Sequence, residues 1–316
     1  ISVLQTPTEP TAKPSVSKVF KTRISTMLNM EASTVCTTMG NATINKSNFT
    51  YCEGTYGQAI VNYGNIEVNG SIFDRSKDSS RLNRNGGVLY NGEDGTFTLT
   101  NSVIENTRFK QSSIWPAMFY GVVINEGDMT LTRNVFNNNT PVSYQNIIGT
   151  YNLYNAGKMN ATFNIFTNTM RSHYTQTTYL YAFNNNNGEF YMNHNYFDYN
   201  KDPYKNHTNM EVNQFFVLNF EPDYMPLEIG ENTTLKVTLK QNNGKFYSDY
   251  SKLPEMNIIL DVNGTVMTKK LIDGETSINI NNTQNKGTYY VTAYYGEWNQ
   301  TVQIDIGKEN SSLEVE

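Results

Sequence analysis

The chain has 316 residues, of which 17% are charged, and its net charge is −5. Asn and Thr, with 45 and 36 copies, form about a quarter of the chain, and aromatic residues add 13%. A disordered polyelectrolyte is excluded because it needs high net charge and few aromatics. A nucleic-acid binder is excluded because it needs a basic stripe. No apolar run is long enough for a membrane span, and the length predicts about two domains.

The N-terminal segment reads as a linker and then a cap. Residues 1–16 are rich in Pro, Thr and Ser, which is linker composition. Residues 17–40 are expected to cover the first coil of the domain that follows, because an open end would expose strand edges. The chain begins at Ile1 and shows no signal peptide, so we read it as a mature product or a piece of something longer.

Only two cysteines are present, Cys36 and Cys52. With the three scattered histidines they fit no zinc pattern, and no metal or cofactor is expected. In an extracellular setting a disulfide between them is conceivable. The sequence leaves open whether they are bonded or remain two thiols.

An internal repeat begins after the cap, with a period of about 30 residues. Six segments of eleven residues align without gaps, and most follow a short strand that ends in Asn and a Gly turn. They start at Ala42, Ile66, Phe97, Met129, Met159 and Phe190. Their sixth position is always Ser or Asn, namely Ser47, Ser71, Ser102, Asn134, Asn164 and Asn195. Their eighth position is always Phe or Ile, namely Phe49, Phe73, Ile104, Phe136, Phe166 and Phe197.

Alternation within the repeat places Leu99 and Leu131 on one face and the neighbouring threonines on the other. One unit cannot bury its apolar face alone, but stacked units bury a continuous column. Asn suits the corners, since it tolerates left-handed backbone and its side chain can bond from coil to coil. The pattern predicts a right-handed parallel β-helix over residues 17–220, with the cap and about six coils.

Twelve Asn-x-Ser/Thr sequons favour an extracellular, cell-surface or wall-associated protein. The density follows in part from the abundance of Asn and Thr. The candidate glycosylation sites are Asn41, Asn69, Asn138, Asn160, Asn206, Asn232, Asn263 and Asn299.

A second pattern begins after Phe220. Strands with clean apolar alternation follow one another every 10–20 residues, with turn signals between them. They predict an immunoglobulin-like β-sandwich over residues 221–308, in which Tyr289 takes the position of a tyrosine corner. The polar tail 309–316 is expected to lead to a further module or an anchor.

Residues 89–107, "LYNGEDGTFTLTNSVIENT", and 123–140, "VINEGDMTLTRNVFNNNT", resemble the coils of adhesin-like surface proteins of methanogenic archaea. That family closes its β-helix with a segment resembling "NWWG-N-GP" before an Ig-like repeat. Residues 195–203, "NYFDYNKDP", are similar, with Tyr-Phe-Asp in place of Trp-Trp-Gly. The resemblance covers roughly residues 40–306. It implies a wall-associated, non-enzymatic adhesin, and no catalytic residue carries over.

Parallel β-helices also carry polysaccharide lyases and glycoside hydrolases, whose sign is paired carboxylates on neighbouring strands. Acidic residues are sparse in the repeat, and no Asp-Asp or Gly-Asp-Asp pair lies on a strand. No Ser-His-Asp or Cys-His arrangement has a defensible spacing, and His194 falls at the variable fifth position of the repeat, which indicates an outward or corner site. An enzyme therefore remains the alternative, beside a purely structural wall component.

Aromatic residues gather in coils three to five, where they either stack in the core or form a platform for sugar rings. The group comprises Trp115, Phe119, Tyr120, Tyr144, Tyr151, Tyr154, Tyr174, Tyr179 and Tyr181. We expect the β-helix loops to bind glycans or a partner-cell surface, with the Ig-like domain as spacer. The predicted binding residues are Trp115, Tyr120, Tyr144, Tyr174 and Tyr179.

Overall fold

The structure is a computed structural model, and the chain divides into two compact units. Unit 1 comprises Ile1–Met192 and Pro203–Val212, and unit 2 comprises Asn193–Asp202 and Asn213–Glu316. Residues 193–202 and 213–220, placed in the β-helix on sequence grounds, thus belong to unit 2. The described residues are 16–20, 25–26, 29–31, 34–54, 57–78, 87–110, 120–142, 150–168, 181–185, 187–198, 200–204, 207–221, 224–281 and 285–307.

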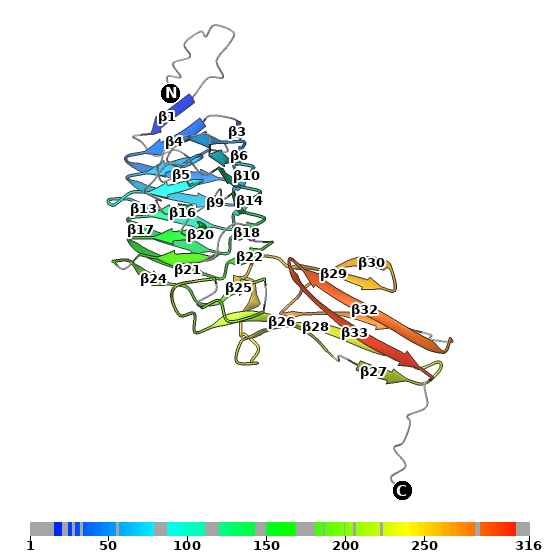
Figure 1. The fold of residues 1–316 in the computed structure, drawn as a ribbon. Coiled ribbons are helices and arrows are strands. Elements are labelled where there is room, and N and C mark those ends of the chain that lie inside the picture. The colour runs from blue at the N-terminus through cyan, green and yellow to red at the C-terminus, as the bar shows by residue number, and fades with distance from the viewer. Residues whose placement is uncertain are drawn as a thin grey trace. The chain divides into compact units, whose positions relative to one another are not determined.

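Unit 1 is a parallel β-solenoid, with its strands stacked coil upon coil (Figure 1). Sheet A comprises β1 (Val16–Phe20), β4 (Thr34–Thr38), β8 (Ile60–Asn62), β12 (Leu89–Asn91), β16 (Tyr120–Asn125), β20 (Thr150–Asn155) and β23 (Ala182–Asn184). Sheet B comprises β2 (Ser25–Thr26), β5 (Asn41–Asn45), β9 (Asn65–Asn69), β13 (Thr96–Thr100), β17 (Asp128–Thr132), β21 (Lys158–Thr162) and β24 (Glu189–Tyr191).

Two further sets of parallel strands complete the coils. Sheet C of unit 1 comprises β3 (Asn29–Glu31), β6 (Asn48–Thr50), β10 (Ile72–Asp74), β14 (Val103–Glu105), β18 (Val135–Asn137) and β22 (Ile165–Thr167). Sheet D comprises β7 (Glu53–Gly54), β11 (Lys77–Asp78), β15 (Arg108–Lys110) and β19 (Thr140–Val142). The predicted parallel β-helix fold is confirmed.

The core follows the predicted alternation. Leu99 pairs in register with Val68 on one side and Leu131 on the other, and all three are buried. Phe136 and Phe166, both at the eighth motif position, stack with ring centroids 4.8 Å apart and planes 8° from parallel. Each coil therefore adds its apolar residues to a column, which no coil could bury by itself.

Two internal polar columns run along the solenoid. At the end of sheet A, the Asn62 amide donates to Asn91 Oδ1 over 2.7 Å, and the series continues through Asn125, Asn155 and Asn184. Between sheets B and C, the sixth-position residues also bond from coil to coil, here with backbone N–H groups as donors. The Ser71 N–H donates to Ser102 Oγ, Ser102 N–H to Asn134 Oδ1, and Asn134 N–H to Asn164 Oδ1. The predicted coil-to-coil bonding is confirmed.

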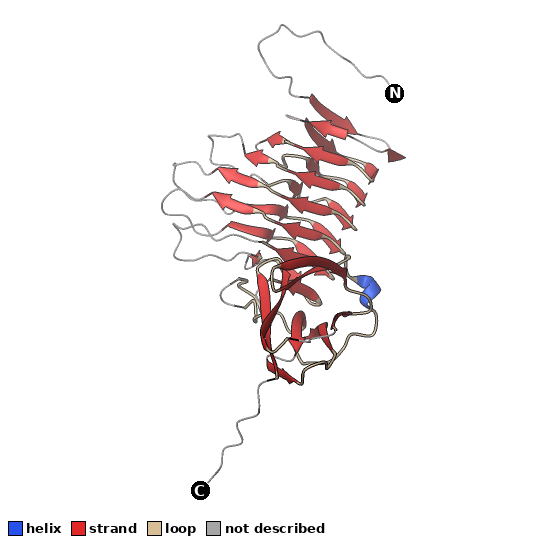
Figure 2. Ribbon diagram, turned by 90° about the vertical axis from the view of Figure 1, so that its right-hand side faces the viewer, coloured by secondary structure: helices blue, strands red, loops and turns tan. Residues whose placement is uncertain are grey.

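Unit 2 is also built from strands. One sheet comprises β25 (Asn195–Phe197), β26 (Phe215–Glu221), β28 (Thr233–Gln241) and β31 (Glu275–Ile280), with the last three antiparallel. Sheet E has the order β27 (Tyr224–Leu227), β33 (Trp298–Ile306), β32 (Gly287–Tyr295), β29 (Asn257–Val262) and β30 (Thr265–Lys270). Among the described residues the one helical element is the 3-10 turn Tyr250–Lys252, the blue segment in Figure 2. The described part of the chain contains no helix long and apolar enough to cross a bilayer.

Candidate functional site

The predicted loop site falls almost wholly outside the described residues. Trp115, Tyr144, Tyr174 and Tyr179 lie there, and Tyr120 is described only as the first backbone position of β16. Three other members of the aromatic group, Tyr151, Tyr154 and Tyr181, are buried and belong to the core. For these three the core interpretation is correct, and the loop site stays a prediction.

A left-handed corner follows the strands of sheet B in each of the six repeats. The fifth motif position has a positive φ in every repeat, at Lys46, Gly70, Asn101, Arg133, Phe163 and His194. Non-Gly residues seldom adopt this backbone, and Asn adopts it most readily. The variability of this position follows because the corner constrains the backbone and not the identity of the side chain. His194 is therefore a corner residue, as the repeat indicated.

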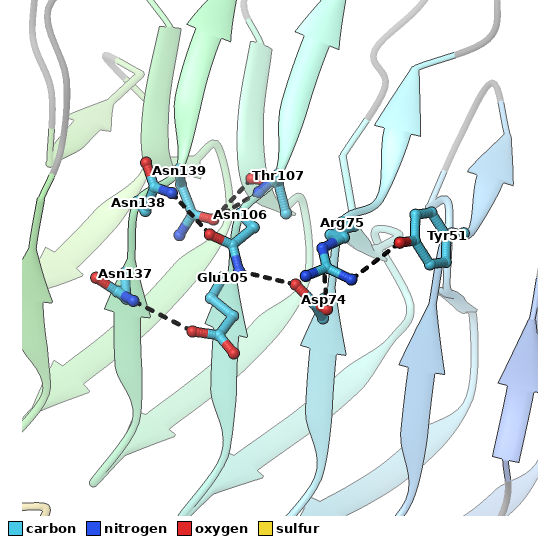
Figure 3. Close-up of polar contacts among 9 residues, drawn as sticks. All are labelled: Tyr51, Asp74, Arg75, Glu105, Asn106, Thr107, Asn137, Asn138 and Asn139. Atoms are coloured by element: carbon cyan, nitrogen blue, oxygen red, sulfur yellow. Dashed lines mark hydrogen bonds and ion pairs between the residues drawn. The ribbon is translucent and has the colours of Figure 1, made fainter.

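A second left-handed corner follows the strands of sheet C, at Tyr51, Arg75, Asn106, Asn138 and Asn168. Four of these residues, Tyr51, Arg75, Asn106 and Asn138, take part in the polar contacts drawn in Figure 3. The Asn138 amide donates to Asn106 Oδ1 over 2.7 Å, and the Asn106 amide donates to Asp74 Oδ1 over 2.9 Å. Arg75 Nε lies 3.6 Å from Asp74 Oδ2, and the Arg75 guanidinium donates a hydrogen bond to the Tyr51 hydroxyl. The hydrogen bond to Tyr51 and, to a smaller extent, the charge of Asp74 raise the pKa of Arg75.

This edge carries the carboxylate pair that sequence reasoning missed. Asp74 and Glu105 are register partners on β10 and β14, so their strands lie about 4.8 Å apart. Both occupy the ninth motif position, which is the signal that would have revealed them. Each carboxylate accepts a hydrogen bond from a side-chain amide, Asp74 from Asn106 and Glu105 from Asn137. The pair is therefore part of a polar column. Among the described residues, no three His, Cys, Asp or Glu side chains form a set that could hold a metal ion.

The outer face of sheet B carries a shallow depression of about 520 Å³. Its floor and rim come from strands β13, β17, β21 and β24, which pair in parallel register. The lining residues are Thr96, Phe97, Asp128, Met129, Thr130, Lys158, Met159, Asn160, Glu189, Phe190 and Tyr191.

Two columns of outward side chains give this depression its chemistry. In one column Lys158 lies between its register partners Asp128 and Glu189, and all three are exposed. No ion pair within 4.0 Å joins them in the described chain. In the adjacent column Asn160 lies between Thr130 and Tyr191, and the Tyr191 side chain is 49% exposed. Hydroxyl, amide and charged groups therefore line the depression beside the exposed ring of Tyr191.

Sugar rings bind to such surfaces through CH–π stacking on an aromatic face and through hydrogen bonds to fixed amides and hydroxyls. Tyr191 supplies the aromatic face, and Asn160 and Thr130 supply hydrogen-bonding groups. Lys158 adds a cation that is flanked by the carboxylates of Asp128 and Glu189. Sequence reasoning did not identify this site, although Thr130, Asn160 and Tyr191 share the second motif position.

The remaining predicted sites are distributed over both units. Cys36 and Cys52 are buried thiols, and no disulfide joins them in the structure. Asn138 is half-buried and Asn206 lies outside the described residues. The predicted glycosylation sites with exposed side chains are Asn41, Asn69, Asn160, Asn232, Asn263 and Asn299.

The chain matches no known protein-family model and no curated protein. Among solved structures, domains 4 and 5 of the S-layer protein SbsC are similar, with 16% sequence identity and a TM-score of 0.22. The likeness covers 31% of this chain and 55% of that one, so the chain spans about half the length of the structure it matches.

Proposed function

We propose that the chain is an extracellular, adhesin-like module of a cell surface, and that it binds glycans on the outer face of sheet B. The observation that carries the proposal is the depression in which exposed Tyr191 adjoins Asn160, Thr130 and Lys158. The parallel solenoid holds these groups on paired strands, so the surface is preorganised and little ordering is required when a ligand binds. The resemblance to adhesin-like surface proteins of methanogenic archaea agrees with this role.

The loops of coils three to five, with Trp115, Tyr144, Tyr174 and Tyr179, are proposed as further contributors to glycan contact. The proposal is non-enzymatic and requires no cofactor. Surface location is supported by the sequons with exposed asparagines, such as Asn41 and Asn232.

Unit 2 is proposed to be an immunoglobulin-like spacer. Its support is the strand order. The three strands β26-β28-β31 match A-B-E of an immunoglobulin sandwich, and β33-β32-β29 match G-F-C. The Tyr289 hydroxyl, near the start of β32, donates to the Asn285 carbonyl over 3.4 Å, as a tyrosine corner does.

The test is a glycan array on the full chain with two Tyr→Ala variants. Tyr191→Ala removes the exposed ring of the depression, and Tyr290→Ala removes a ring of similar exposure (52%) from sheet E. We expect Tyr191→Ala to weaken binding about tenfold, which matches the loss of one stacking contact. Tyr290→Ala should bind like the parent chain. Equal binding by parent and Tyr191→Ala would reject this site.

One observation favours a second candidate, a polysaccharide-cleaving activity. Asp74 and Glu105 are in-register carboxylates on neighbouring strands, beside the cation of Arg75. Retaining glycosidases hold two carboxyl groups about 5–5.5 Å apart. New reducing ends or unsaturated products from array glycans, lost in Asp74→Asn and in Glu105→Gln, would establish the enzyme. Intact glycans with specific binding would support the adhesin.

A further inference from the structure

The sequon Asn160-Ala161-Thr162 lies wholly within β21. Alternation turns Asn160 and Thr162 outward, while Ala161 is fully buried. The Asn160 side chain has no hydrogen-bond partner among the described residues, and it lines the depression next to Tyr191. An acceptor amide and its sequon hydroxyl are thus presented side by side on the proposed binding face.

Other sequons of the solenoid differ from this one. The Asn138 amide is engaged with Asn106, on left-handed backbone with a φ of 51°. The sequon at Asn69 crosses a corner, so Ser71 is buried and its hydroxyl bonds back to the Asn69 carbonyl. Asn41-Ala42-Thr43 resembles the Asn160 sequon in its alternation but lies on β5, outside the depression.

We propose that Asn160 is an N-glycosylation site and that its glycan covers the depression, so that modification turns off glycan binding there. The masking effect rests on the proposed function, whereas the modification does not. In the transfer step, a bond forms between Asn160 Nδ2 and C1 of the first sugar. In the donor, a lipid-linked diphosphate oligosaccharide, the bond between C1 and the phosphate oxygen breaks. The lipid diphosphate leaves, and the amide loses one proton.

Tethering explains why the attached glycan would exclude a free one. A group held by a short link has an effective concentration in the millimolar range. Shallow polar sites gain little binding energy from each sugar, so soluble glycans have no advantage over the tethered one. The first sugar on Asn160 would lie against Tyr191, because the two residues are register partners on adjacent strands.

The experiment compares the full chain from a host that performs N-glycosylation with the chain from a host that does not. Thr162→Ala removes the sequon and keeps Asn160, and Thr162→Ser keeps both. Thr140→Ala removes only the Asn138 sequon. Intact glycopeptide mass spectrometry reports occupancy of Asn160, and a glycan array reports binding. Oxidative footprinting reports the exposure of Tyr191 whether or not any array glycan binds.

We expect an occupied Asn160 in the parent chain and in Thr162→Ser from the glycosylating host, with array binding reduced about tenfold and Tyr191 oxidation reduced several-fold. Thr162→Ala should restore both array binding and Tyr191 oxidation, and Thr140→Ala should leave both as they are in the parent chain. An unmodified Asn160 would overturn the proposal, as would a modified chain in which Tyr191 stays fully reactive. If the unmodified chain binds no glycan while Tyr191 is still shielded, the proposed function fails and the modification stands.

Discussion

The side-chain amide of Asn91 donates to Oδ1 of Asn125 over 2.8 Å, and both residues are fully buried. Asn125 in turn donates to Asn155 over 2.8 Å and to the carbonyl of Gly127 in its own turn over 2.8 Å. One side chain thus links three coils and fixes the turn between sheets A and B. A polar group in the apolar solenoid is tolerated because each member of the column finds partners.

Replacing Asn125 by Ala is expected to lower the free energy of unfolding by about 2–3 kcal/mol, because it removes the donor to Asn155 Oδ1 and one acceptor of the Asn91 amide within the buried column. Chemical denaturation followed by circular dichroism measures the change. Asn65→Ala, at an exposed position of β9, is the matched control and should change stability by less than about 0.5 kcal/mol. Similar losses in the two variants would show that the column contributes nothing.

Two glycines should differ strongly in their tolerance of substitution. A Cβ on Gly127 would lie 2.4 Å from the carbonyl oxygens of Gly92 and Gly95, so Gly127→Ala is expected to cost about 3 kcal/mol or more. Gly70 has a φ of 63°, and the nearest atom to a Cβ there is Lys46 Cγ at 3.5 Å. Gly70→Asn should stay within about 1 kcal/mol of the parent, since Asn accepts this backbone. Thermal unfolding of both variants measures these changes in stability. A Gly127→Ala variant as stable as the parent would contradict the close contact between coils.

Thiol labelling tests the state of the cysteines. Burial raises the pKa of the Cys52 thiol to about 12, so hardly any reactive thiolate exists at pH 8. The native chain is therefore expected to react with a thiol reagent only on the timescale of unfolding, and the denatured chain should release two thiols. An unfolded, unreduced chain with no thiol would mean that Cys36 and Cys52 are bonded after all.

Unit 2 contains a group that should make stability depend on pH. Burial lowers the pKa of His194 and outweighs the hydrogen bond with Gln214, which raises it, while the positive charge of Lys252 lowers it slightly further. The unfolded chain therefore binds a proton more readily than the folded one, so His194 contributes no penalty above about pH 6.5 and destabilises the fold as the pH falls below it. Urea midpoints between pH 7.5 and 5 should fall in the parent chain and fall less in His194→Asn. An identical pH profile would assign the effect to other groups.

The solenoid could be predicted because its determinants are local. Leu99 and Leu131 alternate with threonines, and Ser102 and Asn134 mark the corners at a constant offset. Those features fix both the coil and its register, which the strand pairing reproduces. Much of unit 2 was predictable for the same reason, since the buried positions Leu235, Val237 and Leu239 alternate along one strand.

The depression could not be predicted from the same pattern. It depends on side-chain sizes compared across strands, where Tyr191 follows Asn160 in a column whose other members are smaller. A repeat alignment records the residue types that successive coils share at each position. This site depends instead on Tyr191, which differs from the other residues at the second motif position. The carboxylates Asp74 and Glu105 lie 31 positions apart in the chain and meet only through the register of β10 and β14.

The asparagine column from Asn62 to Asn184 also determines how the solenoid would respond to mechanical load. The hydrogen bonds between its side-chain amides connect successive coils, so a pull along the stacking direction loads them in series. Each junction between two coils then bears the full tension. In a series arrangement the weakest junction ruptures first, and its coil can open while the others hold, because each coil contacts only its neighbours. Shear or flow acting on the solenoid would then be dissipated by stepwise peeling of coils, with repair by re-stacking when the force subsides.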